Sequence, residues 1–271
     1  DYLYYESAFN IYLKEFLKEK YKLPFLYFIP FKASRLKLRK YKKCLNLKLL
    51  IVVNIKKYLL HGDIHGAYSL FIKALKDQGF NPEEDLCVCT GDLIDRGKES
   101  DLTPSLINEP WFETVIGNHE EFCIQGLNDS YTENIHSAYN NGGAWFYKLP
   151  YKDRVQIVSL FQSLPYAIQL NLENKKLGIA HADLPSNDWN EAVKLIEQNC
   201  YVDGRDPLAI TTWSRATANK IQSNQFVDSI KNIDQLYLGH TVVKSPIISG
   251  NINLIDTGAV FTGNVTLIRV K

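Results

Sequence analysis

Residues of the types that bind metal ions follow five short apolar runs of the sequence. These residues are Asp63 and His65, then Asp92, then Asn118 and His119, and finally His181 and His240. Carboxylates, imidazoles and an amide suit Mn²⁺, Fe, Zn²⁺ or Mg²⁺ better than they suit soft metals. A carboxylate has two oxygens, so Asp92 can bridge two cations, which in two-metal hydrolases lie about 3.5–4 Å apart. The pattern therefore predicts a centre for two divalent cations.

The six histidines divide into two groups by their place in the sequence. Four of them, at positions 65, 119, 181 and 240, closely follow an apolar run, and the pattern also contains three Gly-Asp or Gly-Asn steps. One such histidine alone would more often be structural, whereas the joint pattern favours metal binding. The other two are His61, which ends a run but precedes the motif, and His136. We interpret both as structural.

The elements that must position these residues are short strands that alternate with helices from residue 58 onward. The expected strands are Tyr58–Leu60, Leu86–Thr90, Thr114–Ile116, Tyr166–Leu170, Leu177–Ala180 and Leu236–Leu238. We expect helices at Ala67–Gln78 and over most of residues 188–232, and a closing β pair of Ile252–Ile255 with Val265–Val270. This alternation is typical of βαβ units, and in α/β sheets the loops beyond the strand carboxyl ends converge on one crevice. Side chains that follow five different strands should therefore meet.

Residues 1–57 differ from the rest of the chain. They hold 14 Lys and Arg against four Asp and Glu, whereas residues 58–271 hold 17 against 26. We expect 1–57 to be a basic, aromatic-rich N-terminal extension with an amphipathic helix near Ala8–Tyr21, and 58–271 to be the catalytic domain. The extension is either an arm for an anionic partner or a segment that is solvated or packed on the domain.

The overall composition excludes several classes of protein. The net charge is only +1, which favours no nucleic-acid partner, and no apolar run approaches the roughly 18–20 residues of a membrane span. No signal peptide is recognisable, and the five Cys form no regular framework, so we expect free thiols and a cytoplasmic location. Cys87 and Cys89 should be buried on one face of a strand. The chain contains no Met, so we expect a fragment or a processed form.

Three sequence blocks resemble the signature of the phosphoprotein phosphatase family of metallophosphoesterases. The blocks are Gly62–Gly66, Gly91–Gly97 and Gly117–Glu120. Further segments, including Asn141–Phe146 and Ile255–Phe261, are similar to the group of the bacteriophage lambda Ser/Thr protein phosphatase. The resemblance covers about residues 58–271. It implies a calcineurin-like α/β fold in which central mixed β-sheets form a β-sandwich flanked by α-helices, with the metal site at the carboxyl ends of the strands.

The same resemblance implies roles for individual residues. The implied metal ligands are Asp63, His65 and Asp92 for one cation, and Asp92, Asn118, His181 and His240 for the other. His119, oriented by Asp95, would act as the general acid, and Arg96 and Arg215 would bind the phosphate. The lambda enzyme has an Arg immediately before its Gly-Asn-His, where this chain has Ile116. One phosphate-binding cation of that group is therefore missing here.

The resemblance implies a metal-dependent protein phosphatase. Its substrates would be phosphoserine and phosphothreonine monoesters of proteins or peptides, with phosphotyrosine as an extension. Two divalent ions, Mn²⁺ by preference, would provide a bridging hydroxide that attacks phosphorus directly. Independently of the resemblance, we expect the protein to be a monomer. No Cys is followed by Arg six positions later, which argues against a Cys-dependent tyrosine phosphatase. The alternatives are a diadenosine tetraphosphate hydrolase and a non-catalytic metal-binding protein.

Overall fold

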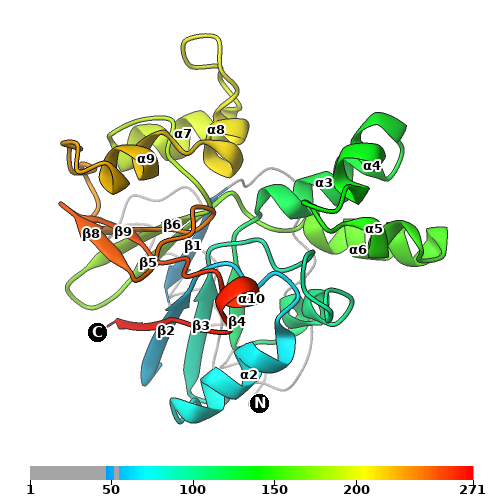
Figure 1. Cartoon of the computed structure of the whole chain (residues 1–271). Coiled ribbons are helices and arrows are strands. Elements are labelled where there is room, and N and C mark those ends of the chain that lie inside the picture. The colour runs from blue at the N-terminus through cyan, green and yellow to red at the C-terminus, as the bar shows by residue number, and fades with distance from the viewer. Residues whose placement is uncertain (1–46, 52–54, 271) are drawn as a thin grey trace, which may run out of the picture.

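Two β-sheets pack face to face between two layers of helices (Figure 1). The computed structural model describes residues 47–51 and 55–270. The helix expected near Ala8–Tyr21 lies outside these residues. The expected α/β sandwich of mixed sheets flanked by helices is confirmed. Within the described part of the chain, no helix has the length and apolar character needed to cross a bilayer.

The smaller sheet has four strands. They are β2 (Lys57–His61), β3 (Asp85–Cys89), β4 (Phe112–Thr114) and β10 (Leu267–Val270). Their order is β10-β2-β3-β4. Strands β2, β3 and β4 run parallel, and β10 is antiparallel to β2. The three parallel strands therefore present their carboxyl ends at one edge of the sheet.

The larger sheet has six strands. They are β1 (Leu47–Ile51), β5 (Ala167–Asn171), β6 (Lys176–Ala180), β7 (Gln235–Leu238), β8 (Ile247–Ser249) and β9 (Ile252–Leu254). Their order is β1-β5-β6-β7-β9-β8, in which β6, β7 and β9 are parallel. Strand β1 lies inside the segment 1–57 and pairs in parallel with β5. The end of that segment thus contributes a strand to the sheet, and the role of the remainder stays a prediction.

The helices form two groups, and the first group precedes the second in the sequence. The first group comprises α2 (Tyr68–Asp77), the 3₁₀ helix η1 (Thr103–Asn108), α3 (Asn118–Gly126), α4 (Ser130–Ser137), α5 (Ala144–Tyr147) and α6 (Tyr151–Phe161). The second comprises α7 (Trp189–Gln198), α8 (Pro207–Trp213) and α9 (Ala216–Gln222), and the short α10 (Ala259–Thr262) follows β9. In Figure 1 the two groups lie on opposite sides of the sheets.

Alternate residues of each strand face opposite sides of its sheet. In β3, Leu86 and Val88 join the apolar core between the two sheets. Cys87 and Cys89 instead join the core between the smaller sheet and its helices. Both thiols are buried and free, so the expectation of two buried cysteines on one strand face is confirmed.

The expected closing β pair of Ile252–Ile255 with Val265–Val270 is wrong. Strand β9 pairs with β7 and β8 in the larger sheet, whereas β10 pairs with β2 in the smaller one. Helix α10 carries the chain from one sheet to the other, between Gly258 and Gly263, whose φ values are +67° and +70°. Period-two apolar alternation predicts a strand but contains no information about its partner. The expected strand Thr114–Ile116 is also displaced, since β4 ends at Thr114.

The core between the sheets makes a measurable contribution to stability. Ile179 in β6 is fully buried there, whereas Ile248 in β8 is 69% exposed. We expect Ile179→Ala to lower the free energy of unfolding by about 2–5 kcal/mol, because the deletion leaves a cavity. The matched change Ile248→Ala should cost less than about 0.5 kcal/mol. Urea unfolding followed by circular dichroism measures both, and equal losses would contradict this packing.

Candidate dinuclear metal centre and active site

The metal-binding residues predicted from the sequence converge at the carboxyl ends of strands from both sheets. Asp63 and His65 follow β2, Asp92 follows β3, Asn118 and His119 begin α3 after β4, His181 follows β6, and His240 follows β7. The first three strands belong to the smaller sheet and the last two to the larger one. The convergence was expected from the sequence, whereas its division between two sheets was not.

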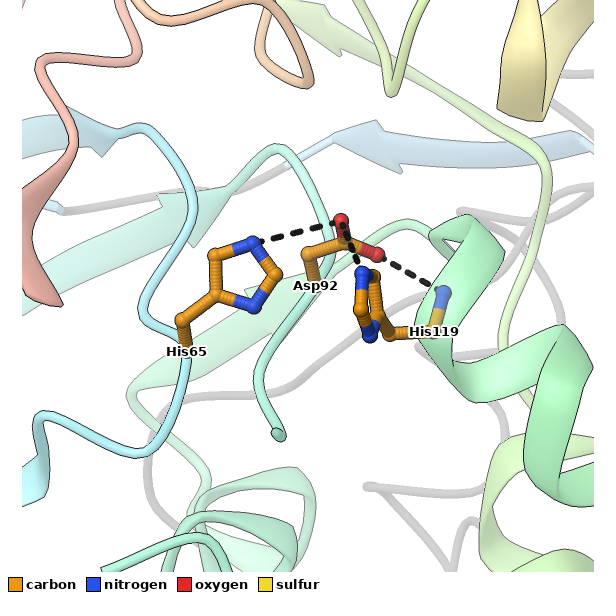
Figure 2. A group of neighbouring side chains, drawn as sticks. All are labelled: His65, Asp92 and His119. Carbon is orange, nitrogen blue, oxygen red and sulfur yellow. Dashed lines mark hydrogen bonds and ion pairs between the residues drawn. The ribbon is translucent and has the colours of Figure 1, made fainter. Parts of the chain in front are cut away.

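Asp92 lies at the middle of the cluster. Its Oδ2 is 3.5 Å from Nε2 of His65, 4.0 Å from Nε2 of His119 and 3.4 Å from Nε2 of His181. The backbone N–H of His119 donates to Oδ1 of Asp92 at 3.0 Å. Figure 2 shows His65 and His119 on either side of this carboxylate.

The potential ligand atoms form two groups that share Asp92. One group contains His65, Asp92 and His119, and the other contains Asp92, His181 and His240. In the second, Nε2 of His181 lies 3.0 Å from Oδ1 of Asn118 and 3.1 Å from Nδ1 of His240. Two overlapping groups with a common carboxylate have the composition that a dinuclear site requires.

Asp63 connects the two sheets next to these groups. Its Oδ2 lies 3.9 Å from Nε2 of His65, and its Oδ1 lies 3.9 Å from Nδ1 of His181. Both oxygens also accept the backbone N–H of His240, at 3.1 and 3.0 Å. The loop after β7 is thereby fixed to the loop after β2.

Hydrogen bonds orient the imidazole rings toward the centre. Nδ1 of His65 lies 2.8 Å from the carbonyl of Ile94, and Nδ1 of His181 lies 2.7 Å from the carbonyl of Thr90. A carbonyl only accepts, so each Nδ1 carries a proton, and Nε2 is the nitrogen of each ring that faces the centre. Metal-binding histidines usually have this arrangement, in which a carbonyl that accepts from one ring nitrogen fixes the orientation of the other.

The electrostatics of the cluster favour bound positive charge. Burial and the neighbouring Asp256 raise the pKa of Asp63 well above its usual value. Burial alone would raise the pKa of Asp92, but His181 and the other imidazoles hold it well below its usual value. Burial would likewise lower the pKa of His181, but Asp92 and Asp63 raise it to about 10. Buried carboxylates that draw a proton onto a histidine are suited to cations, so this donor set fits two divalent metal ions.

Glu120 fixes the backbone around Asp92. Its Oε2 accepts the N–H groups of Asp92 and Gly117 at 3.0 and 2.9 Å, and its Oε1 accepts that of Leu93 at 2.9 Å. Burial and the charge of Asp92 raise the pKa of Glu120 to about 7. Glu120 belongs to the third sequence block, but its supporting role was not predicted.

Five of the site residues have left-handed backbone conformations. They are His65, Asp92, Asp95, Arg96 and His240, with φ between +46° and +73°. Such conformations cost a non-glycine residue of order 1–3 kcal/mol and persist where the surrounding structure enforces them. Gly117 leaves the space that the Asp92 carboxylate occupies, because a Cβ there would lie 2.2 Å from Oδ1 of Asp92.

The two arginines predicted to bind phosphate lie on different sides of the cluster. Arg96 contacts Nε2 of His65 and also lies over the exposed ring of Phe261, 5.7 Å from its centroid. Arg215 donates to the carbonyl of His240 at 2.9 Å. Asp183 supports the Arg215 loop by accepting the hydroxyl of Ser214 at 2.9 Å. Ile116, which replaces an expected Arg, is buried, and its N–H donates to the carbonyl of Pro165.

Asp95 contacts His119, as expected, and also His136 and Trp145, which were not expected to contact the site. Its Oδ2 is 2.6 Å from Nδ1 of His119 and 2.6 Å from Nε2 of His136, and Trp145 donates to Oδ1 at 2.7 Å. Burial would raise the pKa of Asp95, but the bonds from His119 and His136 lower it to about 2. The interpretation of His136 as purely structural therefore missed a contact within the site. His61, in contrast, packs edge-on against Phe71.

Comparison with protein families matches residues 56–244 to the calcineurin-like phosphoesterases. The chain belongs to this family. It is 34% identical over 213 residues to serine/threonine-protein phosphatase 2 of Salmonella typhimurium, which covers 78% of this chain and 91% of that relative. It is 28% identical over 231 residues to a bis(5'-nucleosyl)-tetraphosphatase of Anoxybacillus flavithermus, covering 78% of this chain and 89% of that relative.

Solved structures show the same phosphoesterase fold. A cold-active protein-tyrosine phosphatase of Shewanella superposes with a TM-score of 0.54 at 18% identity, covering 83% of this chain and 77% of that chain. A protein serine/threonine phosphatase of Saccharomyces cerevisiae superposes with a TM-score of 0.51 at 17% identity, covering 75% and 67%. At these identities the likeness concerns the fold alone.

Loss of the shared carboxylate should weaken metal binding at both groups of this phosphoesterase. We expect Asp92→Asn to reduce Mn²⁺ affinity by at least about 100-fold, since loss of an outer partner alone typically costs 10–100-fold. The wild-type chain should gain about 2.7 kcal/mol of stability at a Mn²⁺ concentration of 100 times its Kd, and the variant should gain almost none. Titration calorimetry and thermal unfolding measure these effects. Asp101→Asn, at an exposed position, is the control, and unchanged Mn²⁺ binding by Asp92→Asn would contradict the shared ligand.

Proposed function

We propose that this phosphoesterase is a metal-dependent protein phosphatase that hydrolyses phosphoserine and phosphothreonine monoesters. The observation that carries the proposal is the contact between His119 and Asp95 at the ligand cluster, where Nε2 of His119 lies 4.0 Å from Oδ2 of Asp92. This adds a proton donor to a phosphate-binding centre, and a protein that only binds metal has no use for one. The 34% identity to a serine/threonine-protein phosphatase over most of both chains supports the same substrate class.

The residues proposed to hold the metal ions are those predicted from the sequence. They are Asp63, His65 and Asp92 for one ion, and Asp92, Asn118, His181 and His240 for the other. When bound, two divalent ions would supply Lewis-acid stabilisation of the phosphate and activate the attacking water. Mn²⁺ is the ion we propose, because oxygen and imidazole ligands suit it.

The side chains of the protein then perform the remaining steps. Arg96 and Arg215 balance the charge of the phosphoryl oxygens from two sides of the cluster, as charge-assisted bonds to phosphate do. His119 protonates the departing oxygen from Nε2, because its Nδ1 is held by Asp95. The ionised Asp95 stabilises a positively charged imidazole and fixes its orientation.

A second candidate is hydrolysis of dinucleoside tetraphosphates. The identity of 28% to a bis(5'-nucleosyl)-tetraphosphatase over 78% of this chain favours it. That substrate would use the same centre, since in both reactions water attacks phosphorus: one breaks the ester bond to an alcohol and the other breaks a P–O–P anhydride bond and releases two nucleotides. Ile116 stands where an Arg was expected. The difference bears on the choice of substrate, because it removes one positive charge that would face a phosphate monoester.

A direct comparison of substrates tests the substrate class. With Mn²⁺ we expect kcat/KM for phosphoserine and phosphothreonine peptides to exceed that for diadenosine tetraphosphate by at least about tenfold, which corresponds to about 1.4 kcal/mol. Release of inorganic phosphate and chromatography of nucleotides measure the two activities. The reverse ratio would favour the tetraphosphatase, and no turnover of either substrate by Mn²⁺-loaded protein would contradict both.

The general-acid role predicts a dependence on the leaving group. We expect His119→Asn to lower kcat about 10²–10⁴-fold for a phosphoserine peptide, whose alkoxide needs a proton, and much less for p-nitrophenyl phosphate. Its Mn²⁺ affinity should stay near the wild-type value. Because Nε2 of His119 also lies near His65 and Asp92, a large loss of Mn²⁺ affinity would instead identify His119 as a ligand.

A further inference from the structure

Asp95 accepts more hydrogen bonds than a two-residue His–Asp pair requires. His119 and His136 both contact its Oδ2 at 2.6 Å, and Trp145 donates to its Oδ1 at 2.7 Å. Asp95, His119 and His136 are each at most 1% exposed. Three protein groups therefore fix both oxygens of this carboxylate, with little access for water to replace any of them.

His136 is itself held from three directions. Its Nδ1 lies 2.9 Å from the hydroxyl of Tyr147, and its ring stacks on Phe122 with centroids 5.1 Å apart and an interplanar angle of 18°. A Cβ on Gly143 would lie 2.1 Å from Nε2 of His136, so only glycine leaves room for the ring there. The ring thus has one position, and in that position Nε2 points at Asp95.

The hydrogen bonds have a consistent direction from donor to acceptor. Burial raises the pKa of Tyr147, so its hydroxyl keeps its proton and can donate to Nδ1 of His136. The carboxylate of Asp95 only accepts, so Nε2 of His136 carries a proton and donates it in the 2.6 Å bond to Oδ2. Helices α5, α4 and α3 contribute Tyr147, His136 and His119 to this chain of contacts, and Asp95 joins them from the loop after β3.

We propose that His136 is a positioning residue for the reaction: its Nε2–H aims the carboxylate of Asp95 at His119. This inference rests on the proposed general-acid role of His119. Without the bond from His136, one oxygen of Asp95 loses a donor, and the carboxylate can turn within its broad χ2 well. His119 would then spend less time with Nε2 directed at the leaving oxygen, and small misplacements of such groups are costly to the rate.

A third metal site at Asp95, His119 and His136 is a poorer explanation of the same cluster. Both nitrogens lie 2.6 Å from Oδ2 of Asp95, which is a hydrogen-bond distance. Ligand atoms at about 2.0–2.2 Å from a tetrahedral cation would stand well over 3 Å apart. The cluster is a hydrogen-bond network that serves the neighbouring metal centre.

Two substitutions of nearly equal size and polarity test the proposal. In His136→Gln the amide nitrogen is as many bonds from Cβ as Nε2 of histidine, so it can still donate to Asp95. In His136→Asn the amide is one bond shorter and reaches only the place of Nδ1. We expect His136→Asn to lower kcat about 10–100-fold for a phosphoserine peptide with Mn²⁺. In the same variant, KM for the peptide and kcat for p-nitrophenyl phosphate should each change less than about threefold. His136→Gln should recover most of the lost kcat for the peptide.

Tyr147→Phe provides a second variant that removes a single oxygen. It frees Nδ1 of His136 but leaves the ring packing intact, so we expect a smaller loss, about two- to fivefold, again confined to the phosphoserine peptide. Equal losses with both substrates for all three variants, or no loss in His136→Asn, would overturn the positioning role. Thermal unfolding and Mn²⁺ binding of each variant show whether it is folded and loaded.

Variants of His119 separate this inference from the proposed function. In the His119→Asn background, His136→Asn should cause almost no further loss, because both changes act through the same group. If His119→Asn lacks the dependence on leaving group, the general-acid role itself fails. If His119→Asn loses more kcat for the phosphoserine peptide than for p-nitrophenyl phosphate and His136→Asn does not, the general-acid role of His119 is supported and only the positioning role of His136 fails.

Discussion

The carboxylate of Asp92 is the interaction on which the remainder of the site depends. Three imidazole nitrogens lie within 4.0 Å of its Oδ2, and both groups of potential ligands include it. Its own backbone has φ +47°, a conformation that Glu120 stabilises by accepting its N–H. The imidazoles thus offset the negative charge of Asp92, and Glu120 offsets the strain of its backbone.

Asp95, three residues after Asp92 in the chain, shows the same combination of a buried carboxylate, positive φ and several polar partners. Asp95 also has positive φ, is buried and ionised, and is surrounded by donors from three helices. Two buried carboxylates only three residues apart would normally be costly. Here each has its own set of partners, so the first can hold positive charge while the second orients an imidazole. The helices α3 to α5, which cover the smaller sheet, thereby take part in the site.

The sequence was sufficient to predict the residues that follow strands. Asp63, His181 and their counterparts stand at the end of recognisable apolar runs, so their convergence could be inferred from topology alone. His136 had no comparable signal, because it lies within α4 among ordinary polar neighbours. Glu120 lies in the third sequence block, but its bonds to the backbone around Asp92 depend on the fold and could not be inferred from the block. The pairing of β9 and β10 with different sheets was also not predictable, because alternation does not identify partners.

The division of the candidate ligands between two sheets links binding to the packing of the whole sandwich. His65 and Asp92 belong to loops of the smaller sheet, and His181 and His240 belong to loops of the larger one. Metal ions bound by all four residues would link the two sheets, so the binding free energy of the ions would oppose separation of the sheets. The centre also joins segments far apart in the chain, so its complete set of residues depends on the packing of both sheets.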